Sequence, residues 1–331
     1  MAPTAEALLD PVLDLVRDTL QAQFRRDVLA GLSQEQKAIP ARWFYDHRGS
    51  QLFEEITALP EYYPTRAEIE ILASRCGDIA EAVGEGRAVI EFGAGSAAKT
   101  PLLLTCINPS AYVPVDISGE FLRESCEGLA QRYPDLPIHP VEADFTLPVD
   151  VPAAVGGSER LGFFPGSTIG NLVPDAAVDL LRAMRETLGD DSMLLIGMDR
   201  IKEQSVLTAA YNDAAGVTAA FNLNLAHRIN RELDGTIQVE ALCHHAIWND
   251  DRTRIEMHLE AIRDIAFQIC GRRFTMRAGE TIHTENSHKY DERSATALLL
   301  AGGWEPVKQY RDDDNRFMVI LAQASADRIT P

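Results

Sequence analysis

Short apolar runs alternate with amphipathic segments along the middle of the chain, from residue 88 to about residue 198. The runs have the length of buried strands, and the segments between them carry apolar residues at helical spacings of three and four. Alternation of this kind is typical of a parallel sheet with helices on both faces. The pattern predicts strands at 87–92, 111–115, 138–142, 161–165 and 192–197, and helices at 99–106, 119–132 and 174–188.

The segment before this alternating region has a different pattern. An amphipathic stripe predicts a helix over 5–30. Thr65 and Glu68 form a capping-box pattern, which predicts the start of a helix that continues to Val83.

The segment after the alternating region changes period twice. A helical pattern over 206–233 gives way at 254–261 to a period of two, which places Met257 on the apolar face of a strand. A helix at 291–301 and an antiparallel strand pair, at 304–310 and 317–321, are predicted to close the chain.

We therefore predict an α/β fold with two lobes. A nucleotide-binding core would comprise residues 66–198 and 291–331. A second, substrate-binding lobe would comprise residues 1–65 and the inserted segment 199–290.

A glycine turn and a following acid mark the ligand corner of the core. Gly93 permits a tight turn after the first strand, Gly95 lets a ligand approach the backbone, and Ala98 lets the next helix pack closely. Asp116 ends the next strand, 21 residues after Gly95, where its carboxylate can accept hydrogen bonds from ribose hydroxyls. The spacing predicts a nucleotide cofactor.

Two cofactors compete for this corner. A nicotinamide-dependent oxidoreductase would hold pyrophosphate at the helix N-terminus, whereas a methyltransferase would place the cationic end of S-adenosylmethionine there. Glu91 favours the second, because an acid at the strand end attracts a cation and repels pyrophosphate. Asp144 could bind the adenine amino group with Phe145 against the ring, although Asp144 could instead cap a turn.

Charge and cysteine content limit the partners. The net charge is −19, with 50 acidic and 31 basic residues, which disfavours nucleic acid and membrane surfaces as partners. The chain shows no membrane-length apolar run and no signal pattern at its start, so we expect a cytoplasmic protein, and a monomer. The cysteines are scattered, and we expect buried thiols rather than disulfides: Cys76, Cys106, Cys126, Cys243 and Cys270. No metal site is expected, because the neighbours His244 and His245 point to opposite faces of a strand and at most one could join His258.

The substrate should meet the cofactor at the carboxyl ends of the strands. The fourth strand of the core ends in Gly-Ser-Thr-Ile-Gly-Asn at 166–171, and Asn171 offers both a donor and an acceptor. A turn or helix cap is an equally good role for Asn171 on these grounds alone.

This stretch also carries a family resemblance. Together with the aromatic-rich motif between Trp43 and Arg66, and with the stretches at 211–218 and 285–290, it resembles the L-histidine Nα-methyltransferases of ergothioneine biosynthesis. The resemblance extends from about residue 35 to the C-terminus. It implies a class I methyltransferase core with a substrate-binding lobe, which would trimethylate the histidine α-amine to hercynine and release S-adenosylhomocysteine.

The resemblance also implies roles for individual residues. The cofactor would be surrounded by Tyr62, Gly93, Lys99, Asp116, Asp144 and Phe145. Tyr45, Phe53 and the backbone at Gly166 would flank the amine, and Asn171 and Tyr211 would hold the substrate carboxylate. The imidazole would be bound by Glu285 and Ser287, with Met257 beside it.

Some alternatives stay open at this point. Without the resemblance, Glu285 would be taken as a surface acid beside Lys289, and Met257 and Tyr211 as packing residues. A related methyltransferase could act on tryptophan, although an indole pocket would not need Glu285. A module that only senses S-adenosylmethionine is a further alternative.

Overall fold

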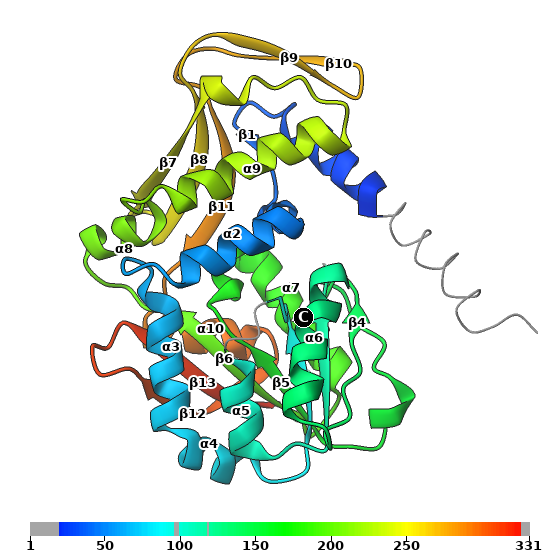
Figure 1. Ribbon diagram of the computed structural model, residues 1–331. Coiled ribbons are helices and arrows are strands. Elements are labelled where there is room, and N and C mark those ends of the chain that lie inside the picture. Colours follow the sequence, from blue (N-terminus) through cyan, green and yellow to red (C-terminus); the bar gives the residue numbers. More distant parts are fainter. Residues whose placement is uncertain (1–19, 96–98, 118, 326–331) are drawn as a thin grey trace, which may run out of the picture.

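The central sheet has seven strands in the order β12, β13, β6, β5, β2, β3, β4 within the described part of the chain. The computed structural model describes residues 20–95, 99–117 and 119–325 (Figure 1). The strands are β2 (Ala88–Phe92), β3 (Ala111–Asp116), β4 (Val141–Glu142), β5 (Arg160–Phe164), β6 (Met193–Asp199), β12 (Trp304–Arg311) and β13 (Phe317–Ala324). Only β13 breaks the parallel arrangement, since it runs antiparallel to both β6 and β12.

The order of the strands reverses at β2, which pairs with β3 on one side and β5 on the other. Open parallel sheets bind ligands beyond the carboxyl ends of the strands at such a reversal. The ends of β2, β3 and β5 therefore define the expected position of the site.

Helices cover both faces of this sheet. On one face lie α7 (Pro174–Leu188) and α10 (Glu292–Ala301), and the other face carries α3 (Tyr63–Ser74), α4 (Cys76–Val83), α5 (Thr100–Ile107) and α6 (Gly119–Arg132). Two short 3-10 helices, η2 (Ala153–Val155) and η3 (Thr168–Asn171), lie in the connections. The strands β2 and β3 are buried along their whole length, as expected for parallel strands between two helical layers.

A smaller sheet forms the second lobe, in the upper part of Figure 1. Its order is β1 (Lys37–Ala38), β11 (Thr281–His288), β8 (Arg254–Ala261) and β7 (Leu242–Asn249). The hairpin of β9 (Ile265–Ile269) and β10 (Arg272–Met276) forms a separate two-stranded sheet. The helical elements of this lobe are η1 (Ala41–Phe44), α2 (His47–Thr57), α8 (Gln204–Tyr211), α9 (Val217–Glu232) and η4 (Val239–Ala241), and residues 20–31 are also helical. They share one apolar core with the inner face of the sheet.

The strand β11 contains a β-bulge. His283 pairs with His258 of β8, but the next registered pair is Glu285 with Met257, so Thr284 is an extra residue. Because side chains alternate between the faces of a strand, the shift places Glu285 on the same face as Met257.

Most elements predicted for the central region and the C-terminus are confirmed within one to three residues, but the flanking helices differ. The capping box is wrong: α3 begins at Tyr63 with Pro64 in its first turn, and Glu68 pairs with Lys99 instead. The helix predicted to run to Val83 is divided at Arg75. The helical stretch 206–233 is likewise divided between α8 and α9. Part of the predicted helix 5–30, namely 5–19, lies outside the described residues, as does Ala98.

The expectation of free cysteines is wrong for one pair. Cys76 of α4 and Cys106 of α5 form a disulfide with a Cα–Cα distance of 5.4 Å. Two cysteines 30 residues apart along the chain do not predict this contact, because it depends on how α4 packs against α5. Cys126, Cys243 and Cys270 are free thiols.

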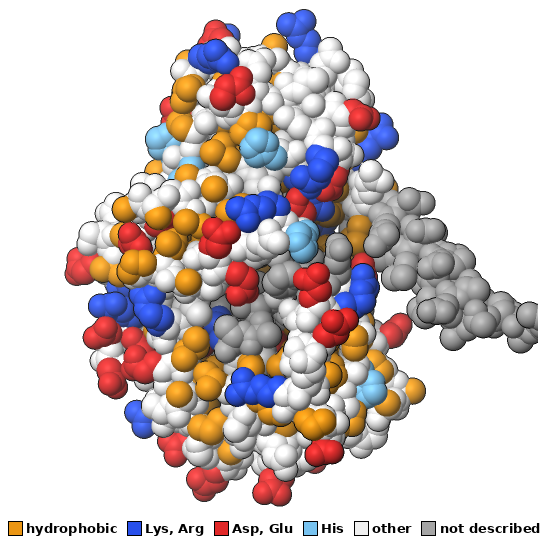
Figure 2. All heavy atoms as spheres, viewed as in Figure 1, with side chains coloured by type: hydrophobic (Ala, Val, Ile, Leu, Met, Phe, Trp, Pro, Cys, Tyr) orange, Lys and Arg blue, Asp and Glu red, His pale blue; other side chains and the backbone are white. Residues whose placement is uncertain are grey.

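The described helices include none with both the length and the apolar character needed to cross a membrane. On the face drawn in Figure 2, Lys and Arg side chains lie scattered among acidic ones and do not form a basic patch.

Candidate active site

Two adjoining cavities lie between the central sheet and the second lobe. The larger, of about 660 Å³, opens beyond the ends of β2, β3 and β5, and the smaller, of about 40 Å³, lies against the inner face of β8 and β11. Both are lined by Tyr45, Phe53, Tyr62, Gly166, Thr168, Asn171 and Glu285. A total space of this size suits a small-molecule cofactor together with a small substrate.

The glycine turn lies at the floor of the larger cavity. Gly93 has φ +77°, which L-residues rarely adopt, and its N–H donates to the carbonyl of Val115 at 2.8 Å. Gly95, Asp116 and Phe145 line the same cavity. Exposed backbone, a carboxylate at the strand end and an aromatic ring are the groups that a nucleoside cofactor requires, so the site fits S-adenosylmethionine.

A buried ion pair supports the wall beside this turn. Lys99 Nζ lies 2.7 Å from Glu68 Oε2, and the same oxygen accepts a hydrogen bond of 2.8 Å from the Gly166 N–H. A Cβ at Gly197 would lie 2.1 Å from Glu68 Oε1, so glycine there leaves room for the acid. Glu68 was missed as a site residue, because its spacing from Thr65 matches a helix cap.

Two residues assigned to the cofactor do not line either cavity. Glu91 is fully buried and accepts hydrogen bonds from Tyr112 Oη at 2.7 Å and Thr100 Oγ1 at 2.8 Å. Burial raises its pKa to about 7, against the opposing effect of these two donors. Glu91 therefore anchors β2 to β3 and α5 below the glycine turn.

Asp144 is the second of these residues. Its Oδ2 accepts a 2.7 Å hydrogen bond from Arg42, and its Oδ1 accepts one from the Thr146 N–H at 3.1 Å. The turn-cap alternative describes this geometry, and neighbouring Phe145 and Thr146 line the cavity in its place.

An aromatic wall separates the larger cavity from the smaller one. Tyr45 and Phe53 lie edge to face at 5.7 Å between ring centroids, and Phe53 contacts Tyr62 at 6.3 Å. Phe221 of α9, which the sequence did not single out as a site residue, packs against Tyr45 at 5.8 Å. Electron-rich faces and edges of this kind can surround a cationic amine.

The tyrosines of the cavities remain neutral phenols. Burial is the largest cause that raises the pKa of Tyr45 well above its usual value, and the negative charge of Glu285 adds to it. The pKa values of Tyr62 and Tyr211 are also raised well above the usual value, again chiefly by burial. Each hydroxyl is therefore available as a hydrogen-bond donor or acceptor and not as a phenolate base.

Glu285 is the most unusual side chain of the smaller cavity. It is 8% exposed, and its carboxylate has no hydrogen-bonding partner among the residues that the structure describes. Burial raises its pKa to about 8, and the positive charge of Lys289 opposes the shift. A buried carboxylate at a cavity with no hydrogen-bonding partner is able to accept a hydrogen bond from a ligand N–H.

The remaining predicted substrate residues meet around this carboxylate. Tyr211 of α8 and Ser287 of β11 are joined by a 2.6 Å hydrogen bond between their hydroxyls. Met257, on the inner face of β8, and Asn171, at the end of η3, line the same cavity. The structure thus gathers in one place the residues that were predicted to contact the amine, the carboxylate and the imidazole of the substrate. Residues not predicted from sequence also line it: Ile56, Thr168, Thr218 and Phe221.

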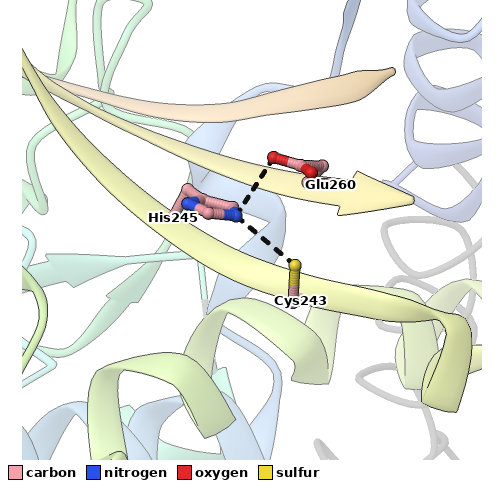
Figure 3. Close-up of side chains that lie close together, drawn as sticks. All are labelled: Cys243, His245 and Glu260. Atoms are coloured by element: carbon pink, nitrogen blue, oxygen red, sulfur yellow. Dashed lines mark hydrogen bonds and ion pairs between the residues drawn. The ribbon is translucent and has the colours of Figure 1, made fainter. Parts of the chain in front are cut away.

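The outer face of the small sheet carries a separate polar cluster (Figure 3). His245 Nε2 lies 3.4 Å from Cys243 Sγ and 3.0 Å from Glu260 Oε2. His244 points the other way, to the carbonyl of Tyr211 at 2.8 Å, as the alternation of strand faces predicted. None of these four residues lines either cavity in the described part of the chain.

The sheet order, the glycine turn, the acid at the end of β3 and an adjoining amine-sized pocket define a class I methyltransferase. The chain belongs to the family of histidine-specific, S-adenosylmethionine-dependent methyltransferases, whose model matches residues 24–324. Family membership sets aside the oxidoreductase alternative.

Curated relatives cover nearly the whole chain. The histidine N-alpha-methyltransferase of Mycolicibacterium smegmatis is 38% identical over 317 residues, which is 93% of this chain and 97% of that protein. The enzyme of the same name from Mycobacterium tuberculosis is 37% identical over 93% of this chain and 97% of its own. A solved structure, the 1,6-didemethyltoxoflavin-N1-methyltransferase of Burkholderia thailandensis, matches with a TM-score of 0.42 and 13% identity over 84% of this chain and 89% of that one.

Proposed function

We propose that the protein transfers three methyl groups from S-adenosylmethionine to the α-amino nitrogen of L-histidine. The product is hercynine, the trimethylated amino acid of ergothioneine biosynthesis. The observation that carries the proposal is the buried Glu285 carboxylate, which faces the smaller cavity without a partner among the described residues. An imidazole N–H supplies the missing donor.

The chain holds the cofactor in the larger cavity. Backbone at Gly93 and Gly95 would lie against the methionine part, the Asp116 carboxylate would accept from the ribose hydroxyls, and Phe145 would pack on the adenine, since all four residues line this cavity. Bound S-adenosylmethionine supplies a methyl group on a sulfonium, which transfers by in-line displacement. The task of the protein is therefore mainly alignment.

Histidine occupies the smaller cavity with its amine toward the cofactor. Asn171 and Tyr211 donate to the carboxylate, and Glu285 and Ser287 bind the imidazole beside Met257. This arrangement directs the amine between the aromatic rings of Tyr45 and Phe53, next to the backbone of Gly166.

The amine must lose a proton before each transfer, because α-amino groups titrate near about 8. The raised pKa of Tyr45, caused mainly by burial, keeps its hydroxyl protonated, so Tyr45 orients the amine and water takes the proton. As methyl groups accumulate, hydrogen bonds to the nitrogen are lost and contacts with ring faces replace them. The aromatic wall therefore suits all three steps.

We further propose that the enzyme acts as a monomer in the cytoplasm. Its exposed large apolar side chains are spread over separate elements: Leu147, Val173, Ile201, Ile247, Ile262, Leu300 and Val307. Disulfides are rare in reducing compartments, so counting of free thiols in the protein taken from cells tests this location: an intact Cys76–Cys106 disulfide would contradict a cytoplasmic enzyme.

Mass spectrometry of the purified protein with S-adenosylmethionine and a panel of free amino acids tests the reaction. We expect histidine alone to gain one, two and then three methyl groups, with the trimethylated species accumulating. Tryptophan as the methylated substrate would reject the role of Glu285 and keep the methyltransferase. Tight cofactor binding without any methylated product would instead indicate a sensor.

A further inference from the structure

Lys289 is a buried cation directly behind the substrate pocket. It is 3% exposed, and its ammonium lies 2.8 Å from the Asp199 carboxylate, which is also fully buried. Burial alone would raise the pKa of Asp199, but Lys289 and Lys202 lower it overall. The sequence offered Lys289 only as a surface neighbour of Glu285.

The other two hydrogens of the ammonium reach substrate-pocket hydroxyls. Lys289 Nζ donates to Ser287 Oγ at 2.7 Å and to Tyr211 Oη at 3.0 Å. With Asp199, these contacts use all three donors of the lysine. A lysine ammonium cannot accept, so both hydroxyl oxygens must each give one lone pair to it.

The count of hydrogens then limits what the two hydroxyls can offer to a ligand. Tyr211 and Ser287 are also bonded to each other at 2.6 Å, which uses one of their two hydrogens. The hydroxyl that donates in this bond keeps one lone pair, and the other keeps its hydrogen. Toward the cavity, the pair presents one donor on one residue and one acceptor on the other.

We propose that Lys289 is a positioning residue that restricts this pair to one donor and one acceptor, so that Tyr211 donates to the substrate carboxylate and Ser287 accepts from the imidazolium N–H that does not face Glu285. The assignment rests on the proposed function, because histidine supplies both groups. A carboxylate can only accept, which decides the direction: Tyr211 must be the donor, and Ser287 must donate to Tyr211.

The same contacts connect the two lobes. Asp199 ends β6 of the central sheet, whereas Lys289 follows β11 of the small sheet. Asp199 is also bonded to Tyr63 Oη at 2.6 Å and paired with Lys202. The direction of the Tyr211–Ser287 bond is therefore anchored to the lobe that carries the cofactor.

Lys289→Met tests the proposal, with Lys202→Met as its matched control. Both variants remove one lysine from Asp199, but only the first touches Tyr211 and Ser287. We expect Lys289→Met to raise KM for histidine roughly 10- to 100-fold with a smaller change in kcat, because binding groups lose their orientation. Binding of S-adenosylhomocysteine, measured by calorimetry, should change less than about twofold in either variant and also reports on folding. Lys289→Arg, which keeps the charge and the donors, should recover part of the loss.

A second readout separates orientation from general damage. A double-mutant cycle with Ser287→Ala supplies this readout, because Lys289 donates to Ser287. In the Ser287→Ala background, Lys289→Met should raise KM for histidine by a factor about fivefold or more smaller than it does in the wild type.

The outcomes separate the proposals. The role of Lys289 is overturned, and the proposed function stands, if KM is unchanged in Lys289→Met, if KM rises equally in Lys202→Met, or if the effects of Lys289→Met and Ser287→Ala on KM are simply additive. A wild type that binds S-adenosylhomocysteine but does not methylate histidine overturns both.

Discussion

The cofactor half and the substrate half of the site are built in different ways. The cofactor cavity is formed mainly by turns at the ends of neighbouring parallel strands, with Gly93, Asp116 and Gly166 close together because their strands are paired. The substrate cavity draws side chains from distant segments, such as Tyr45 and Glu285. The first depends on local backbone, and the second depends on how two lobes meet.

The buried acids show the same contrast. Glu68 and Glu91 of the cofactor half have protein partners, namely Lys99 for the former and Tyr112 with Thr100 for the latter. Glu285 of the substrate half has no hydrogen-bonding partner among the described residues. The comparison indicates that the substrate half keeps one polar group for its ligand to complete.

Glu285→Gln should produce the largest effect. A neutral amide replaces a charge-assisted partner, so kcat/KM for histidine should fall roughly 10- to 100-fold, while affinity for S-adenosylhomocysteine changes little. Steady-state kinetics and calorimetry measure the two quantities separately.

Glu260→Gln is the matched control, because Glu260 lies on the outer face of the same sheet in the cluster of Figure 3. Equal losses in the two variants would mean that the sheet as a whole is perturbed and that Glu285 does not read the substrate.

Asp116→Ala should weaken the cofactor half by a smaller factor. Loss of the acid at the end of β3 should raise the dissociation constant of S-adenosylhomocysteine about 10- to 30-fold, which corresponds to about 1.4–2 kcal/mol, near the lower end of the contribution of a charged hydrogen bond. Asp144→Asn should change it less than about threefold, since Arg42 and Thr146 hold that carboxylate outside the cavity. A similar loss of S-adenosylhomocysteine affinity in Asp144→Asn would support a role of Asp144 in adenine binding. Asp144 would then have to separate from Arg42 when the cofactor binds.

The smallest effect is a pH dependence of stability. Burial raises the pKa of Glu285 to about 8 from 4.5, so the native state binds more protons than the unfolded state between these values. The contribution of Glu285 to stability is therefore fully present below about pH 4.5 and is lost as pH rises to about 8. Glu285→Gln should gain in Tm over wild type across this interval, by roughly 2–6 °C.

Glu91→Gln provides the comparison within the cofactor half. Burial raises the pKa of Glu91 to about 7, so the gain in Tm of Glu91→Gln over the wild type should stop growing near that pH. The gain in Tm of Glu285→Gln should continue to grow up to about pH 8. Thermal melts at intervals between these values measure both. Superimposable curves for the two variants would contradict the contrast between the halves.

The sequence predicted the central sheet well because each strand and helix carries its own periodicity. The turn at Gly93 and the acid at Asp116 follow directly from their positions after apolar runs. Local signals failed where a partner decides the outcome. Glu68 matched a helix cap but pairs with Lys99, and Cys76 joins Cys106 across two helices.

The substrate half required the family resemblance. From sequence alone, Tyr211 and Met257 are equally well explained as packing residues and Glu285 as a surface acid. No sequence spacing relates the three, because α8, β8 and β11 meet only in the folded lobe. Lys289 and Phe221 carried no signal at all as site residues. A contact between lobes is a property of tertiary structure, which periodicity does not report.

The bulge at Thr284 links substrate choice to the register of β11. Glu285 is two residues from His283, so in a regular strand both would face outward; the extra residue turns Glu285 and Ser287 inward. Deleting Thr284 would remove the bulge but leave Glu285 directly after His283, still on the inner face opposite Met257. A regular strand that kept every residue would instead pair Glu285 with Glu256 on the outer face, so the position of these side chains in this enzyme depends on strand register as well as on residue identity.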